Sequence, residues 1–276
     1  MSSIMKAKLN SCSLQLYSKV LFLCHLIILK STELFSILDS VDSTNNYAMA
    51  KIHAGMAKHG MAWFAHDQQA GKGQFGKNWE SKAGQNITLS IAITPAAVFF
   101  QNQFYFNAVV AIACMEFFKK YAGAETFIKW PNDLYWRDRK AGGILIENKI
   151  MGKSWKWAVV GIGININQAS FSKNLGNAVS LEQITGQTFD PVFLAKELTG
   201  LVLAGISNVS AIHLPAILLK YNENLYKKDQ KIFLKKDEMV FETCIKEVNE
   251  FGQLITFDSM ERQFNFGEVE FLFQRS

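Results

Sequence analysis

The sequence predicts an α+β fold, in which a large first part of strands and helices is followed by a small C-terminal β-barrel. Over residues 35–228, short apolar runs typical of strands are interspersed with helical patterns. Residues 103–121 repeat apolar side chains at helical spacing, with Gly123 just after them. From Ile232 onward only short strand patterns occur, punctuated by Gly252 and Gly267, which is typical of a small barrel.

The first part is expected to alternate strands with helices. A hydroxyl of Ser43 or Thr44 is expected to cap the first helix. Period-two patterns predict strands at 35–38, 61–66, 86–94, 127–130, 134–136, 143–147 and 156–165, and the third of these is expected to be half-buried. The last four form a β-meander. Further helices are predicted at 179–185, 192–206 and 214–226.

The change of pattern near Lys227-Lys228-Asp229 suggests a domain boundary. We predict an N-terminal extension at 1–34, a large domain at 35–228 and a small β-domain at 229–276. Strands of the small domain are expected at 232–234, 239–248, 253–257 and 264–273.

Composition excludes several classes of protein. With 276 residues, 49% of them hydrophobic, the chain is long enough for a folded core. The net charge of +5 is modest, and the lysines at 227, 228, 231, 235 and 236 have the spacing of a solvated helix end and linker rather than a nucleic-acid face.

The cysteines and the N-terminus favour a cytoplasmic protein. Cys12, Cys24, Cys114 and Cys244 are far apart and without CxxC spacing, so a zinc site is not expected and a reducing compartment is. The apolar run at 20–29 is shorter than the roughly 20 residues that span a bilayer, and no convincing cleavage site follows it. A membrane-anchored form would depend on this run alone.

Four motifs bear on chemistry, and the most conspicuous is a loop rich in glycine and lysine. It reads Gln68-Gln69-Ala70-Gly71-Lys72-Gly73-Gln74-Phe75-Gly76-Lys77-Asn78-Trp79. Its glycines let backbone N–H groups approach an anion closely, and its lysines add positive charge. The loop is not a Walker A motif, and it is not a dinucleotide fingerprint because no helical pattern follows it. Taken alone, it is equally typical of a surface loop.

The second motif has two neighbouring parts and is more specific. They are Lys129-Trp130-Pro131-Asn132-Asp133 and Lys140-Ala141-Gly142-Gly143. Proline extends the preceding residue and presents the Asn-Asp pair at the end of a strand. Such a pair is usually a simple turn, but the nearby lysine motif favours a functional site.

The remaining motifs are Ser43-Thr44-Asn45 and the strand Gly161-Ile162-Gly163-Ile164-Asn165. Glycine inside a strand marks either close approach of a ligand or a bulge, and the two interpretations are even for this strand alone.

In this order, the motifs resemble those of biotin protein ligases, the enzymes that attach biotin to the carrier domain of biotin-dependent carboxylases such as acetyl-CoA carboxylase. The resemblance runs from about Phe35 to the C-terminus. It implies a mixed β-sheet flanked by helices, as in class II synthetases and biotin/lipoate ligases, with an SH3-like C-terminal barrel. It also implies that biotin and MgATP form biotinyl-5′-AMP, whose acyl group passes to a carrier lysine.

The resemblance also assigns expected roles to residues of this sequence. The expected biotin-binding residues are Ser43, Thr44, Asn45, Gln68, Gly71, Lys72, Gly73, Gly142, Gly161 and Gly163. The expected ATP and adenylate contacts are Gln74, Gly76, Lys77, Trp79, Lys129, Asn132, Lys140 and Asn165. Lys140, Asp133, Lys72 and Asn132 are the expected catalytic residues. Mg²⁺ is expected to arrive with ATP near Asn132 and Asp133, with no metal held by the protein alone.

Lys140 would stabilise negative charge on the carboxylate and the transferring phosphate. Asp133 would orient or deprotonate the carrier lysine, which is mostly protonated at neutral pH.

Two departures from the family pattern lead to predictions. Many members have arginine where this chain has Gln74, and glutamine supplies no charge. The loop is therefore expected to hold the intermediate less tightly unless Lys72 and Lys77 compensate. Members that act as repressors have about 60 residues of winged helix-turn-helix before the catalytic domain. The roughly 35 residues before Phe35 are too few and too apolar for that module, so no DNA binding is expected.

Other interpretations stay open. Lipoate ligases share the superfamily, but their paired arginines and His-Asp ending are missing, since His66-Asp67 precedes the glycines. A non-catalytic binder of biotin or adenylate is a second alternative. Dimers are common among relatives, and the strand at 161–167 is a candidate interface edge.

Overall fold

A computed structural model of the chain describes residues 34–152, 154–172, 177–207 and 209–272. The predictions for the N-terminal extension, its apolar run at 20–29, Cys12 and Cys24 lie outside the described residues.

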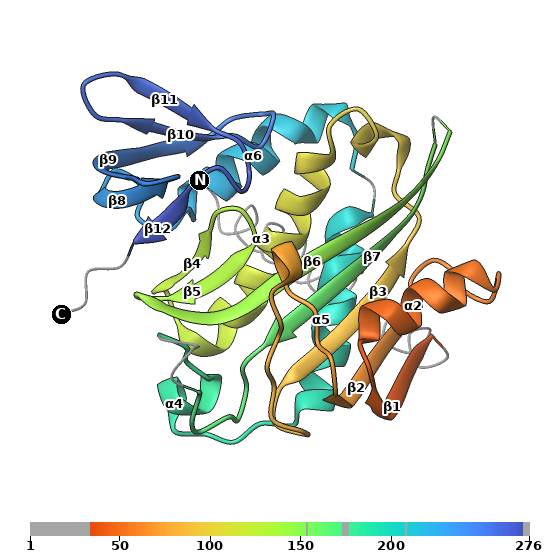
Figure 1. Cartoon of the computed structure of the whole chain (residues 1–276). Coiled ribbons are helices and arrows are strands. Elements are labelled where there is room, and N and C mark those ends of the chain that lie inside the picture. Colours follow the sequence, from red (N-terminus) through yellow and green to blue (C-terminus); the bar gives the residue numbers. More distant parts are fainter. Residues whose placement is uncertain (1–33, 153, 173–176, 208, 273–276) are drawn as a thin grey trace, which may run out of the picture.

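The first part of the chain forms a seven-stranded sheet in the order β1-β2-β3-β7-β6-β5-β4 (Figure 1). Its strands are β1 Phe35–Val41, β2 Ala62–Gln68, β3 Ile87–Ile93, β4 Thr126–Lys129, β5 Asp133–Trp136, β6 Arg139–Met151 and β7 Ser154–Ile164. Only β1 and β2 pair in parallel, and the other neighbours are antiparallel. The sheet is therefore mixed, as the resemblance implied.

Helices cover both faces of this sheet (Figure 1). The long helix α3 (Gln103–Ala122) packs with α5 (Pro191–Ile206) and α6 (Leu214–Glu223) in the main core, and α4 (Leu181–Thr185) contacts α3. Helix α2 (Thr44–His53) lies on the opposite face, where Ala48 and Ile52 form a smaller core with Trp63 and Val159. Most of α3 is buried because apolar side chains surround its axis.

The C-terminal part forms a five-stranded antiparallel sheet in the order β11-β10-β9-β8-β12. These strands are β8 Lys231–Lys236, β9 Met239–Val248, β10 Leu254–Phe257, β11 Glu261–Phe264 and β12 Glu270–Leu272. The α+β fold class is confirmed, and this second sheet is consistent with the SH3-like domain. The single strand predicted at 264–273 is wrong, because a turn with Gly267 at φ +87° separates β11 from β12.

Three local expectations also need correction. Strand β3 is buried at every residue instead of alternating between core and solvent. Strand β7 lies between β3 and β6, so it is not an edge available to a second copy. Ser43 occupies the N-cap of α2, but neither its hydroxyl nor that of Thr44 caps the helix, because Thr44 bonds Gln68 instead.

Within the described residues, no single helix is long and apolar enough to cross a bilayer. Among these residues, α5 and the segment 211–223 have the length and composition of a membrane span only when they are taken together, and they are bent relative to each other by 108°.

Candidate active site

The site is built on one row of cross-strand neighbours in the large sheet. Thr88 pairs with Gly163, Gly163 with Gly143, Gly143 with Asp133, and Asp133 with Lys129. Paired residues of adjacent strands project to the same face of a sheet. The row therefore has two glycines in its middle and two charged side chains at one end, which leaves a shallow trough beside the charges.

A register shift brings Lys140 to this face. Lys140 and Gly143 are three residues apart, and in a regular strand such residues face opposite sides. The shift between Leu134 and Tyr135 pairs Lys140 with Tyr135, which shares a face with Asp133. Bulges next to active sites often redirect a side chain in this way. As a result, Lys140 Nζ lies 2.7 Å from Asp133 Oδ1.

The same alternation separates the two adjacent glycines of the lysine motif. Gly143 lies on the trough face, where its missing side chain would approach Asp133 and Trp79. A Cβ at Gly142 would instead meet Gly163 O and Ile164. Gly143 is thus the glycine that opens the trough, and Gly142 permits close packing of β6 on β7.

The space above the strand glycines of β7 is filled by protein side chains. A Cβ at Gly163 would overlap the Trp79 indole, and one at Gly161 would overlap the Asn45 carboxamide. Trp79 Nε1 is buried and has no hydrogen-bond partner among the described residues. The indole therefore covers Gly163 and forms part of the trough wall.

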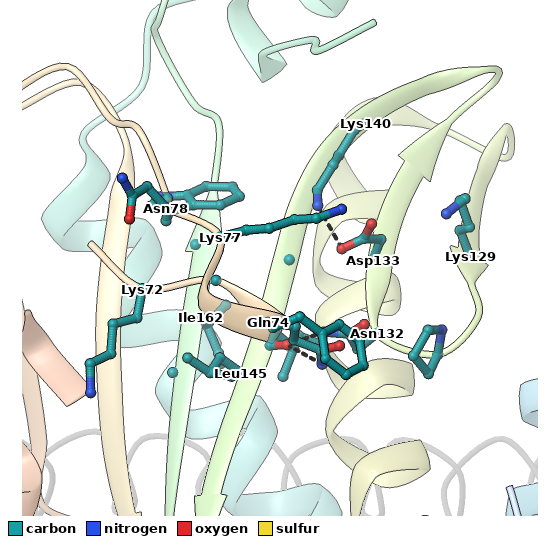
Figure 2. A pocket seen from close by; sticks show the side chains of 18 of the residues that line it. Lys72, Gln74, Lys77, Asn78, Lys129, Asn132, Asp133, Lys140, Leu145 and Ile162 are labelled. Atoms are coloured by element: carbon teal, nitrogen blue, oxygen red, sulfur yellow. Dashed lines mark hydrogen bonds and ion pairs between the residues drawn. The ribbon is translucent and has the colours of Figure 1, made fainter. Parts of the chain in front are cut away.

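Positive charge gathers where the loop meets the end of the row. Figure 2 shows Lys77 and Lys140 pointing toward each other beside Asp133. Lys72 points away from them, on the other side of the loop, and its Nζ lies 3.4 Å from Glu147 Oε1. The loop therefore contributes Lys77, rather than Lys72, to the charged cluster.

A chain of hydrogen bonds joins the Ser43-Thr44-Asn45 motif to the loop. Gln68 accepts from the backbone N–H and the hydroxyl of Thr44 at 2.8 and 3.0 Å. Ser90 Oγ donates to Asn45 Oδ1 at 2.6 Å, and Asn45 Nδ2 donates to Glu147 Oε2 at 2.7 Å. Because Glu147 also binds Lys72, one network fixes the polar end of the site.

These features surround one pocket of about 790 Å³, within the range of small-molecule sites. The predicted residues that line it are Ser43, Thr44, Asn45, Gln68, Lys72, Gly73, Gln74, Lys77, Trp79, Lys129, Asn132, Asp133, Lys140, Gly161, Gly163 and Asn165. Gly71, Gly76 and Gly142 do not line it. The Asn165 amide donates to Val179 O, so part of its hydrogen-bonding capacity is used within the protein.

Residues 37–165 match the model of the biotin/lipoate A/B protein ligase family. The segment contains every residue of the trough and its charged end. The chain is 38% identical over 138 residues to the bifunctional ligase/repressor BirA of Escherichia coli, an alignment that covers 49% of this chain and 40% of that protein. It is 32% identical over 161 residues to the biotin–[acetyl-CoA-carboxylase] ligase of Paracoccus denitrificans, covering 56% of this chain and 65% of that one.

A likeness of fold extends over most of the chain. The biotin protein ligase of Aquifex aeolicus in complex with biotin and ATP superposes with a TM-score of 0.72 at 22% identity, covering 86% of this chain and 98% of that one. In contrast, the chain spans about half the length of the curated relatives it matches.

Several residues that line the pocket or support its lining side chains were not predicted from the sequence. Ser90 and Glu147 belong to the polar network, and the second sheet contributes Lys235, Asp237 and the segment 266–271. A hydroxyl inside a largely apolar strand, such as Ser90, needs a partner once that strand is buried. The second-sheet residues have no local sequence feature that places them at the pocket.

A metal site of the protein's own is not evident. Among the described residues, no three His, Cys, Asp or Glu side chains gather as metal ligands. Asn132 and Asp133 supply oxygen atoms at the pocket wall, the ligand type that Mg²⁺ prefers, but Asp133 already pairs with Lys140. These residues suit an ion that arrives with most of its ligands from a nucleotide.

Proposed function

We propose that the protein is a biotin–[acetyl-CoA-carboxylase] ligase, which uses ATP to biotinylate a lysine of a carboxylase carrier domain through biotinyl-5′-AMP. The observation that carries this proposal is the glycine trough, which lies within the segment that matches the ligase family. The trough ends at Lys77, Lys129, Lys140 and Asp133. A trough suits a slender acyl chain, and lysines suit the carboxylate and phosphate that must meet at its end.

In the first step, a biotin carboxylate oxygen attacks the α-phosphorus of ATP. An acyl–phosphate bond forms, the bond to the bridging oxygen breaks, and pyrophosphate leaves with that electron pair. Lys140 and Lys77 point toward each other beside Asp133 (Figure 2), and their charges would stabilise the negative charge that accumulates on the phosphate. Preorganised cations of this kind stabilise a transition state more than they stabilise the ground state. Mg²⁺ would accompany ATP as part of the substrate.

In the second step, the carrier lysine amine attacks the acyl carbon and AMP leaves. The amine must lose a proton, and Asp133 is the carboxylate nearest to Lys140 in the pocket. When Lys140 turns toward the phosphate, Asp133 is released to accept that proton. The polar network of Thr44, Asn45 and Gln68 would bind the ureido ring at the other end.

The test is to incubate the full chain with biotin, MgATP and a carboxylase carrier domain, and to measure the carrier by mass spectrometry. We expect a gain equal to one biotinyl group, dependent on ATP and lost in Lys140→Ala. Lys156→Ala, an exposed lysine on β7, is the matched control and should retain labelling. A gain with lipoate alone would assign the sister activity, and no gain with either acid would favour a non-catalytic binder.

The proposal has consequences for partners and location. The proposed partner is the carrier domain. We propose a cytoplasmic location because the cysteine usage is typical of a reducing compartment. Absence of nucleic-acid binding and formation of a homodimer stay predictions, for which electrophoretic mobility shift and sedimentation are the direct measurements.

A further inference from the structure

The tip of the loop makes a contact that the family motif does not explain. We call residues 73–77 the Phe75 loop and residues 265–268, between β11 and β12, the Phe266 turn. The rings of Phe75 and Phe266 lie 4.7 Å apart between centroids, at an interplanar angle of 39°. Phe266 also packs edge-on against Trp130, at 6.1 Å and 90°. One ring of the second sheet thus bridges the loop and the end of β4.

The loop is shaped to present Phe75. Its base is closed by a bridge between Lys72 and Asn78 and by the Gly73 N–H, which donates to Lys77 O at 2.6 Å. Phe75 adopts φ +53°, a left-handed conformation that is costly for a residue with a side chain. Phe75 is also 68% exposed, so the core does not hold it there. The ring contact with Phe266 is an interaction that can offset part of this cost.

The Phe266 turn is correspondingly rigid. The Asn265 N–H and amide both donate to the Glu268 carboxylate at 3.0 Å, and the Glu268 N–H donates to Asn265 O at 3.1 Å. Gly267 has φ +87°, and a Cβ there would lie 2.7 Å from Phe75 Cζ. The turn therefore has space for the Phe75 ring only because residue 267 is glycine.

We propose that Phe266 is a positioning residue, through which the second sheet holds the Phe75 loop over the pocket. Residues of both segments line that pocket, so the contact joins two parts of its wall. In this chain Gln74 supplies no charge to retain an intermediate, and the aromatic contact would hold the loop in place instead. This last consequence, slower escape of the adenylate, rests on the proposed function, whereas the positioning itself does not.

The positioning is tested by limited trypsin digestion of the full chain without ligands, following cleavage after Lys72 and Lys77 by mass spectrometry. Phe266→Ala removes the ring without changing the cleaved segment. We expect cleavage to accelerate about 2- to 10-fold, the range that one aromatic pair gives. Phe266→Tyr keeps the ring and should cleave at the parental rate. Phe257→Ala, an exposed aromatic of β10 in the same sheet, is the control.

Two further variants separate the ring contact from general loosening of the turn. Gly267→Ala should accelerate cleavage, whereas Gly123→Ala, with φ +85° but open space around it, should not. The double variant Phe75→Ala/Phe266→Ala should cleave no faster than the faster single variant, because both remove one interaction. Equal cleavage in the parent and Phe266→Ala would overturn the proposal.

The link to the intermediate is tested by incubating the protein with biotin and MgATP but no carrier, and measuring free biotinyl-AMP. We expect Phe266→Ala to release it faster by the same factor as the change in cleavage. If adenylate forms and escapes equally fast from both proteins, the retention role is wrong. If neither protein forms adenylate, the proposed function fails, and the trypsin result still decides the positioning.

Discussion

The charge of Lys129 depends on the groups around it in the pocket. It ends the row of cross-strand neighbours next to Asp133, with Phe271 and Tyr135 against its ammonium group. Burial lowers the pKa of Lys129, and Lys140 and Lys77 lower it further, whereas Asp133 and Glu270 act in the opposite direction. A bound phosphate would favour the charged form, so anion binding and protonation of this lysine are coupled.

We expect the KM for ATP to rise with pH in the alkaline range, measured by biotin-dependent ATP–pyrophosphate exchange. Above its lowered pKa, Lys129 must take up a proton when the anion binds, so affinity is full below that pKa and falls above it. Lys129→Arg stays charged and should remove the rise. Lys156→Arg, at an exposed site, should leave it intact. A constant KM in the parent up to about pH 9.5, below the ordinary lysine pKa of about 10.4, would contradict the coupling.

Gln74 is the second residue whose chemistry departs from the family pattern. Its amide donates to Ile144 O at 3.5 Å, a long contact, and it lines the pocket beside Asn132. We expect Gln74→Arg to slow release of biotinyl-AMP by about 10- to 100-fold, because a hydrogen bond to a charged group contributes about 1.5–3 kcal/mol. Release is measured by filtration after one turnover, with the exposed Gln187→Arg as control. An unchanged rate would show that the loop already retains the intermediate by other contacts.

At the scale of elements, the two glycines of β7 lie directly beneath the side chains of Asn45 and Trp79. We expect Gly161→Ala and Gly163→Ala each to lower the free energy of unfolding by about 1–3 kcal/mol, because the new methyl group would overlap Asn45 or Trp79. Gly200→Ala in α5 meets open space and should raise it by about 0.5–1 kcal/mol. Urea unfolding compares the three variants. Parental stability in Gly163→Ala would mean that Trp79 leaves its place freely.

Most elements of the fold were predictable because local patterns specify them. The 20-residue helix α3 and the meander strands have the expected periodicity and turn residues. The final strand was not predictable, since 264–273 is apolar enough for one strand and only φ at Gly267 reveals the turn. The full burial of β3 was also missed, because tertiary partners decide whether Ser90 faces solvent.

The site was predictable as a set of residues, but its geometry was not. Nothing local indicates that a register shift brings Lys140 to the face of Gly143 and leaves Gly142 on the other. The pairing of Lys72 with Glu147 is likewise a contact between distant segments. The motifs indicate the type of chemistry, whereas the strand register determines which of their side chains lie close together.

At the scale of the whole molecule, α6 and the end of β4 join the two sheets. The Asn222 amide donates to Val248 O at 2.9 Å and its carbonyl accepts from the Val248 N–H at 2.7 Å, so a buried side chain of α6 serves as a strand partner for β9. Trp130 Nε1 donates to Gly252 O at 2.9 Å. The Phe266 turn can act on the Phe75 loop only if this junction holds the second sheet in place.

We therefore expect Asn222→Ala to loosen the second sheet selectively. It leaves two backbone groups of Val248 without their partner, each at a cost of about 1–3 kcal/mol in a buried place. Amide hydrogen exchange should speed up about 100-fold along β9, equivalent to about 3 kcal/mol, and change little along β3. Asn224→Ala, whose side chain donates to Lys220 of its own helix, is the control. Equal acceleration along both strands would mean that the two sheets open as one unit, in which case loosening the second sheet would loosen the trough as well.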